Sequence, residues 1–596
     1  MKFNSLSSLV KNLAVFSLFL LLIFVALGKS LHFSLFGDDW FMFYVIDKHY
    51  GPGNQFPYSS LQGYFQPWGV MNICLIIIRH FFGYLSYGYF LVSMVLRVIA
   101  SFAGFLFLSK FFKSKFIGLI GSLFVLVGYA GIESSNYVLH MNVYLVIIFL
   151  FLSLIFLVDS YKGKLWKFIL GCFLFALSLA VNPLRSHGLL PFILFFDVVF
   201  GIAIAKTSLK TILIRQALLI AAAMIIYKLG FFGEVHTNII NIAVIFRMIG
   251  EGNYTFVSAF VTNLGKAFLP DLYTASVSSI VPVFGANWFK WFIATGLLVE
   301  AILFFVLASV LNERIKNYLV VLCVSIVNFF SAFFILRQFP RDQGLFLILI
   351  NTFIGMFFLS LLFWALYILF LSHKEKRTTG WVGIVAGPIL ILTSLVVPLL
   401  VNPGAIIGSD GRYLTLSLVG VAITFASLLK ITLENNKRIA IFTLVVLLSL
   451  LVFNIKNDRK YIANLYSTRN VEITNLMWNK LFGFLPKNYP DKLLIFYFDD
   501  NENPGLANNT ILFGFPPRMA LEYKIKDPGK IPTFTNIYDE VVSTVTDGKA
   551  FLRLGYSQEK ISVDQVFAFK FTKSGDLVDI TQETRKNLIL EMTKHE

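Results

Sequence analysis

Long apolar segments recur along most of the chain and are separated by short polar stretches. Most of them approach the roughly 20 residues that an α-helix needs to cross about 30 Å of hydrocarbon. The pattern predicts about 13 membrane-spanning helices, at residues 13–27, 89–108, 116–129, 143–158, 168–181, 189–205, 212–230, 292–311, 319–336, 344–371, 382–401, 414–429 and 439–453. The chain is therefore predicted to be a polytopic α-helical membrane protein.

The polar stretches alternate in charge. Lys and Arg gather in every second loop, at 110–115, 162–167, 206–215, 314–316, 374–377 and 430–438. The positive-inside rule places these loops, and the N-terminus, in the cytoplasm. The intervening loops at 38–39, 133–140, 185–187, 234–271, 337–342 and 409–413 then face the exterior. We predict a multi-pass protein of the plasma or inner membrane with an extracytoplasmic C-terminal domain.

Two of the external segments are long, at 29–86 and 231–291. They contain apolar pieces too short to span, at 70–78, 239–249 and 256–268. Such pieces favour helices that lie in the membrane interface or enter the membrane without crossing it. Both segments belong to the predicted membrane domain, residues 1–453. They could cover a catalytic chamber on the external side of that domain.

The pattern changes after residue 453. Alternating apolar runs at 492–498, 566–571 and 577–580 predict strands, and the turn-rich stretch 500–505 separates elements of a compact fold. Residues 454–596 are therefore predicted to form a small α/β domain outside the membrane.

Composition excludes several classes of protein. With 57% hydrophobic and 14% charged residues, a soluble globular chain could not bury its apolar surface. The net charge of +17 comes from Lys and Arg in loop clusters, which indicates membrane topology rather than nucleic-acid binding and also suits anionic lipid headgroups. The three cysteines have no paired spacing, and no phosphate-binding glycine loop for ATP is present in the sequence.

The stretch Phe36–Trp40 carries the first candidate chemistry, because Asp38 and Asp39 are adjacent carboxylates beside an apolar run. Such a pair is costly near a low dielectric and suits a site that handles a proton or a cation. One of them could accept a proton from a hydroxyl, and together they could hold a divalent cation. The alternative is an N-terminal cap for the helix that follows.

Basic residues in three external loops form a second set of candidates. Arg185, with His187 beside it, interrupts an external loop where Arg is disfavoured, and Arg341 and Arg412 each stand beside an Asp. Guanidinium groups bind phosphates well, so these residues suit the phosphate of a lipid. As alternatives to phosphate binding, Arg185 could extend its side chain to the membrane interface from a helix end, and Arg341 and Arg412 could each form an exposed ion pair with the neighbouring Asp.

Other polar and aromatic side chains could line the same chamber. Glu133 and His140 lie in the external loop after residue 129, although a lone His is more often a satisfied interface residue. The aromatic residues Trp40, Tyr64 and Trp68 could stack on sugar rings, or belong to the interfacial aromatic belt. No metal-ligand set is evident beyond the acidic pair.

The order of these motifs resembles the GT-C superfamily of polyprenyl-phosphate-sugar-dependent glycosyltransferases, which includes protein O-mannosyltransferases and lipid A aminoarabinose transferases. The resemblance rests on the cytoplasmic start, the Phe36–Trp40 motif followed by Tyr64–Trp68, and Gly411–Tyr413, which is similar to the family's Arg-Tyr element. Gln66 stands where some members have Arg. The likeness covers residues 1–453.

The resemblance implies an inverting transfer of a sugar from a polyprenyl-phosphate donor to a glycan, lipid or protein acceptor outside the cytoplasm. Asp38 or Asp39 would be the general base, with Asp38 slightly favoured, and Arg185, Arg341 or Arg412 would hold the leaving phosphate. The alternative function is a transporter or flippase of lipid-linked saccharides. It is less favoured, because the spans hold few charges apart from Arg97 and the chain has no visible internal repeat.

Overall fold

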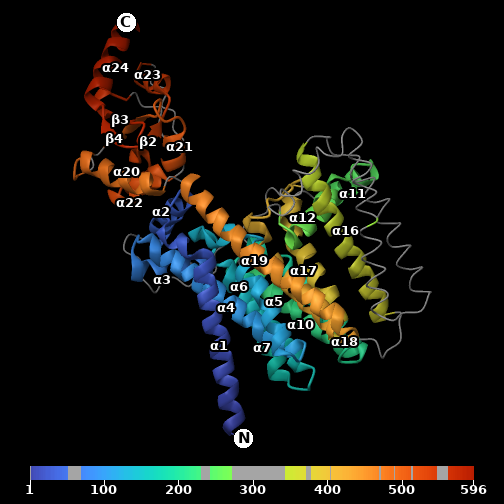
Figure 1. Ribbon diagram of the computed structural model, residues 1–596. Coiled ribbons are helices and arrows are strands. Elements are labelled where there is room, and N and C mark those ends of the chain that lie inside the picture. The colour runs from blue at the N-terminus through green and yellow to red at the C-terminus, as the bar shows by residue number, and fades with distance from the viewer. Residues whose placement is uncertain are drawn as a thin grey trace.

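The computed structural model describes the chain except for residues 1, 51–68, 230–241, 271–297, 299–342, 371–377, 403, 469–470, 489, 491, 512–513, 547–560 and 596. It shows a bundle of apolar helices with a small mixed α/β domain at one end (Figure 1). The N-terminal end of α1 (Lys2–Leu27) lies at the other end of the bundle (Figure 1).

Eight helices of the described residues are long and apolar enough to cross a membrane. They are α1, α4 (Ser86–Phe111), α6 (Val143–Ser160), α10 (Leu209–Lys228), α16 (Gln343–Phe370), α17 (Thr379–Val401), α18 (Ser417–Asn435) and α19 (Lys437–Thr468). The shorter apolar helices α5 (Lys115–Val127), α7 (Leu165–Val181) and α9 (Leu189–Ala203) lie among them. The helical membrane class is thus supported.

Every predicted span that falls within the described residues coincides with one of these helices. The predicted spans at 292–311 and 319–336 lie outside the described residues, apart from residue 298, so the count of 13 stays a prediction. The two described cysteines, Cys74 and Cys172, are free thiols.

Small residues let the helices approach closely. A Cβ atom on Gly387 of α17 would lie 2.0 Å from Thr424 Oγ1 and 2.5 Å from the Gly420 carbonyl oxygen of α18. Such close packing replaces hydrophobic driving force where the surrounding solvent is itself apolar.

The short apolar pieces of the two long segments behave differently. Helix α12 (Thr255–Phe268) is mostly buried among α16, α17 and α18, and the Phe268 ring stacks on Phe358 with centroids 3.5 Å apart. It is therefore inserted into the bundle. Helix α3 (Gly69–Phe82) leaves Phe81 75% exposed, and α11 (Ile242–Gly250) leaves Phe246 68% exposed, as expected for helices on a surface.

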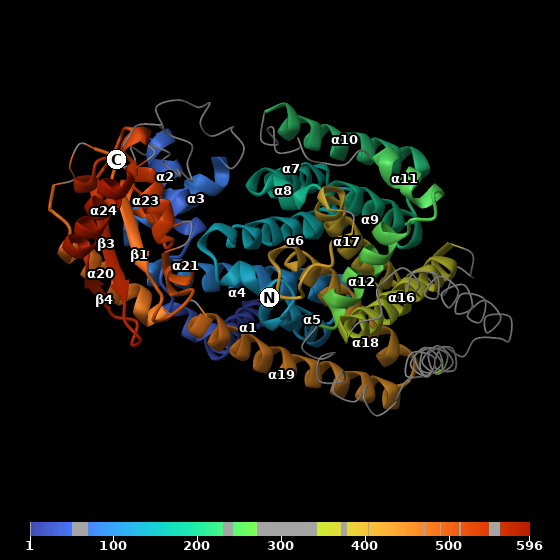
Figure 2. The same ribbon diagram turned by 90° about the horizontal axis from the view of Figure 1, so that it is seen from above.

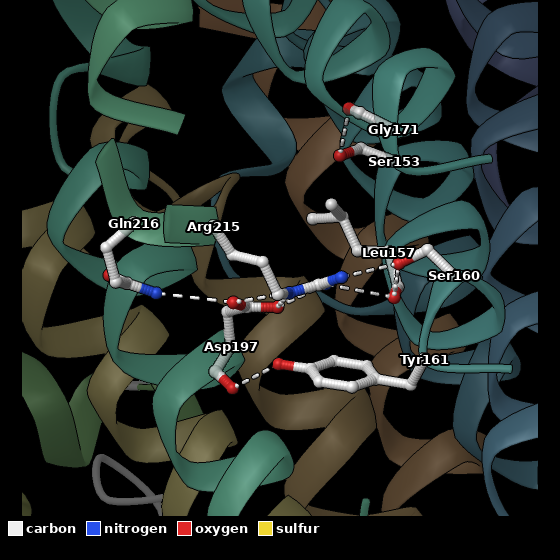
Figure 3. Close-up of polar contacts among 8 residues, drawn as sticks. All are labelled: Ser153, Leu157, Ser160, Tyr161, Gly171, Asp197, Arg215 and Gln216. Atoms are coloured by element: carbon white, nitrogen blue, oxygen red, sulfur yellow. Dashed lines mark hydrogen bonds and ion pairs between the residues drawn. The ribbon is translucent and has the colours of Figure 1, made fainter. Parts of the chain in front are cut away.

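A buried ion pair joins three helices inside the bundle (Figure 3). The Arg215 guanidinium on α10 donates to both carboxylate oxygens of Asp197 on α9, with an Nη2–Oδ1 distance of 2.6 Å. Its remaining N–H groups donate to Ser160 Oγ at 2.8 Å and to the Leu157 carbonyl at 3.2 Å on α6. Each guanidinium nitrogen thus donates at least one hydrogen bond, so this cluster stabilises the packing of α6, α9 and α10.

Helix α19 crosses the boundary predicted after residue 453. It runs unbroken for 32 residues to Thr468 and carries the chain from the bundle to the α/β domain (Figures 1 and 2). The domain proper begins at α20 (Val471–Phe484). The apolar run ends at residue 453, but nothing in Asn454–Lys460 stops a helix.

The C-terminal domain is built on a four-stranded sheet in the order β2-β1-β3-β4. Strand β1 (Ile495–Asp499) pairs in parallel with β2 (Thr533–Thr535) and β3 (Val566–Phe571), and β4 (Leu577–Asp579) pairs antiparallel with β3. Alternate residues face opposite sides. Phe496, Phe498 and Phe569 pack against α20 and α22 (Phe515–Glu522), whereas Tyr497 and Ala568 pack against α23 (Tyr538–Thr546) and α24 (Thr581–His595). The three predicted strands are confirmed.

Candidate functional site

Two loops far apart in the sequence pair at one end of the bundle. The Gly131 N–H donates to the Ser409 carbonyl at 2.9 Å, and the Glu133 N–H donates to the Asp410 carbonyl at 3.0 Å. Gly131 has a φ of 71°, and a Cβ there would lie 2.4 Å from the Thr415 nitrogen, so glycine is required at this contact. The pairing brings η3 (Ile132–Ser135) against η7 (Arg412–Leu414), and η4 (Val138–His140) packs against η3 and reaches η7 through His140.

A buried arginine supports this loop from the bundle side. Arg97 of α4 is fully buried and donates to the Val125 and Gly128 carbonyls at 3.2 and 2.6 Å, and to Ser135 Oγ at 2.8 Å. Its guanidinium therefore fixes the chain as it leaves α5 and enters η3. This charge, which is isolated in the sequence, has a positioning role in the structure.

Glu133, His140 and Arg412 form a charged cluster where the loops meet. Glu133 Oε2 accepts the Arg412 backbone N–H at 2.8 Å, and its Oε1 lies 3.7 Å from Arg412 Nη1. Arg412 Nη1 also lies 2.6 Å from His140 Nε2. Because arginine stays protonated, Nη1 donates and His140 Nε2 accepts, which leaves the imidazole proton on Nδ1.

Arg185 approaches the same cluster from α8 (Pro183–Ser186), between α7 and α9. Asn182 caps this turn by accepting the Arg185 N–H at 3.3 Å, and Arg185 Nη1 donates to Ser134 Oγ at 2.9 Å. The guanidinium carbons of Arg185 and Arg412 lie 5.9 and 5.6 Å from the centroid of the Tyr413 ring. The structure thus gathers Glu133, His140, Arg185, Arg412 and Tyr413.

The charges of this cluster are unbalanced. Among the side chains that the structure describes here, the Glu133 carboxylate alone forms an ion pair with the cluster, at Arg412, and His140 accepts from Arg412 and is neutral. Burial and the neighbouring Arg412 lower the pKa of Arg185 to about 10, although Glu133 acts in the opposite direction. The cluster therefore has a surplus positive charge that an anion would offset.

The acidic stretch begins α2 (Asp38–Tyr50). Asp39 is 1% exposed, and its Oδ2 accepts the Phe36 N–H at 3.1 Å, which is the geometry of a carboxylate that closes the N-terminus of a helix. Asp38 is the first residue of α2, and its side chain lies outside the described residues. The capping alternative thus applies to Asp39.

The two parts of the candidate site lie at the same end of the bundle. Helix α2 lies against η4, which contains His140. Ser30 of η1 (Gly28–His32) donates to Asn136 Oδ1 at 2.6 Å, which ties the chain before α2 to the segment between η3 and η4. Of the other candidates, His187 directly follows α8, whereas Arg341, Tyr64 and Trp68 lie outside the described residues.

The C-terminal domain covers the acidic stretch, which the sequence does not indicate. Arg518 of α22 places its guanidinium carbon 3.9 Å from the centroid of the Trp40 ring, and the Trp40 indole N–H donates to the Leu35 carbonyl at 3.1 Å. A Cβ on Gly514 would lie 3.0 Å from Trp40 Cδ1. Trp40 is therefore 5% exposed and packs against protein, whereas the sequence left open a platform for a sugar ring or the interfacial aromatic belt.

We expect Arg518→Ala to weaken the attachment of the C-terminal domain. A cation over an indole ring that is removed from water contributes about 2 kcal/mol. Faster proteolysis after Thr468 and a red shift of tryptophan emission would report the loss. Glu522→Gln is the control, because it removes the 3.5 Å ion pair with Arg518 but keeps the cation over the ring. Equal effects of the two changes would contradict the role of this contact.

Within the described residues, no group of three or more His, Cys, Asp or Glu side chains could hold a metal ion. The Asp38 side chain lies outside the described residues, so the divalent cation stays a prediction. No protein-family model matches the sequence, and no curated protein matches it significantly.

Proposed function

We propose that the protein is a membrane glycosyltransferase that moves a sugar from a polyprenyl-phosphate carrier to a hydroxyl of a glycan, lipid or protein acceptor. The observation that carries this proposal is the pair Arg185 and Arg412, which converge on Tyr413, whereas among the described residues Glu133 is the one carboxylate that pairs with Arg412. A phosphate at the membrane surface has the charge and the geometry that two guanidinium groups bind.

The proposed reaction is a single displacement. The acceptor hydroxyl oxygen attacks the anomeric carbon and the bond from that carbon to the phosphate oxygen breaks, so the configuration inverts. The hydroxyl proton passes to the carboxylate of Asp38, and the electron pair of the broken bond stays on the lipid phosphate. Arg185 and Arg412 stabilise the charge that develops there.

Neighbouring side chains have positioning roles in this proposal. Glu133 and His140 fix Arg412 through its backbone N–H and its Nη1, and Ser134 holds Arg185. Asp39 holds the first turn of α2, the helix that begins with Asp38. The leaving group is a stable phosphate ester, so the reaction needs no ATP.

The test uses the full chain in lipid nanodiscs with radiolabelled polyprenyl-phosphate sugars and a cell-envelope extract as the source of acceptor. We expect acceptor-dependent release of free polyprenyl phosphate, which falls at least about 100-fold in Arg185→Gln/Arg412→Gln because each charged hydrogen bond contributes about 1.5–3 kcal/mol. The control is Arg438→Gln, which removes an exposed charge in the first turn of α19 and touches no residue of the Arg185–Arg412 cluster. Absence of release with every donor would overturn the proposal.

The alternative function predicts a different result. A flippase would move a fluorescent polyprenyl-phosphate sugar across a vesicle membrane without any acceptor, whereas a transferase would leave its distribution unchanged. Protein-dependent movement that survives Asp38→Asn would replace the transferase proposal by transport.

A further inference from the structure

A hollow of about 460 Å³ lies between the end of α1 and α19, and none of the residues of the Arg185–Arg412 cluster lines it. Phe24, Val25, Gly28 and Lys29 line it from α1 and η1, and Arg459 and Lys460 line it from α19. A Cβ on Gly28 would meet no atom within 4 Å, so the hollow is open at that position.

Three cations surround this hollow without acidic partners. Lys29, Arg459 and Lys460 are exposed, and no ion pair or side-chain hydrogen bond joins any of them to another residue in the described part of the chain. By contrast, the exposed Lys480 forms an ion pair with Asp576. A site with three unpaired cations attracts an anion.

The hollow spans the level where α1 changes from apolar to polar, and α19 lines it from Arg459 onward, about 9 Å beyond the end of its own apolar stretch at Phe453. Helix α1 is apolar to Leu27 and is followed by Gly28 and Lys29, and α19 is apolar to Phe453 and then continues with Asn454 and Lys456. Below that level, Phe24 and Val25 are 42% and 49% exposed, and Val452 is 68% exposed. This change marks the headgroup plane of a bilayer, with exposed apolar side chains facing the acyl chains.

We infer that this hollow binds one anionic phospholipid. Its phosphate lies among Lys29, Arg459 and Lys460, and its acyl chains follow the exposed apolar surface of α1 beside Phe24 and Val25. A free phosphate would use only the three cations, whereas a phospholipid uses both parts of the site. The inference does not depend on the proposed transferase, because it uses none of the residues of that site.

The experiment measures retention of added phosphatidylglycerol on the full chain in detergent by native mass spectrometry. The pocket variant is Lys29→Gln/Arg459→Gln/Lys460→Gln. Each Lys or Arg near an anionic headgroup contributes about a fivefold factor, so the apparent affinity should fall on the order of 100-fold. The control is Lys11→Gln/Lys437→Gln/Arg438→Gln, which removes three exposed cations at the other ends of the same helices and should change the affinity less than about twofold.

A second variant tests the hollow without changing charge. Gly28→Leu places a side chain in the open space and should lower retention of phosphatidylglycerol, while thermal unfolding of the protein stays the same. Equal losses in the pocket and control variants would overturn the site, as would equal retention of phosphatidylglycerol and phosphatidylcholine by the wild type. Displacement of the lipid by inorganic phosphate at equal concentration would show a simple anion site and contradict the proposal.

Discussion

Asp38→Asn is expected to lower the rate of sugar transfer by about 10²–10⁴-fold, which is the usual contribution of a positioned general base. Asparagine keeps the size of the side chain and its hydrogen-bonding atoms but cannot accept the acceptor's proton. Binding of the polyprenyl-phosphate donor should persist, because Arg185 and Arg412 are untouched. Single-turnover transfer and donor retention, measured on the same preparation, separate the two effects.

Asp39→Asn is the matched comparison. Asp39 is buried, and its Oδ2 accepts the Phe36 N–H, a bond that an asparagine carbonyl can also accept. We therefore expect a loss of stability of about 1 kcal/mol and a much smaller loss of turnover. A full loss in Asp39→Asn together with near-normal turnover in Asp38→Asn would reverse the two roles. Retained activity in the double variant would remove the proposed base altogether.

Asp197→Leu is expected to destabilise the protein by about 3–5 kcal/mol, because it leaves the charge of Arg215 buried without its partner. The Arg215 and Asp197 side chains are 8% and 1% exposed. The guanidinium carbon also lies 3.9 Å from the centroid of the Tyr161 ring, so the charge has little room to reach water (Figure 3). Thermal unfolding of the full chain in detergent measures the change.

The double variant Asp197→Leu/Arg215→Met is the control for this prediction. It replaces both charges by apolar side chains of similar size, so most of the stability should return. Asp576→Asn removes the partner of Lys480 in an exposed pair and should cost less than about 1 kcal/mol. Equal losses in Asp197→Leu and the double variant would show that packing, and not the uncompensated charge, decides stability here.

Local patterns were enough to locate most of the elements. A helix that crosses hydrocarbon must satisfy its own backbone and present apolar side chains, so its length and composition are written in one continuous stretch. The predicted strand at 566–571 likewise coincides with β3, because the alternate residues of a strand face opposite layers and this pattern is also written in a short segment. The end of the bundle is harder to place, because α19 continues through a polar stretch that retains good helix formers.

The candidate site could be predicted only as residue types on one predicted side of the membrane. Arg185 and Arg412 were candidates because Arg recurs in the predicted external loops, and Glu133 was a possible lining residue; the structure brings all three together. The sequence could not show that Glu133 accepts the N–H of a residue 279 positions later, since that contact depends on how η3 and η7 pair. Nor could it assign Asp39 to a cap, because the turn geometry at Phe36 decides which carboxylate faces inward.

The sequence by itself therefore determined the helical membrane class, the strands of the C-terminal domain and the residue types of the candidate site, because each follows from interactions within a short segment. Only the tertiary structure decided that the C-terminal domain sits on α2 through Arg518 and Trp40, and that Lys29 meets Arg459 and Lys460 around one hollow. These contacts join segments hundreds of residues apart, and their partners are fixed by packing, which no local pattern records.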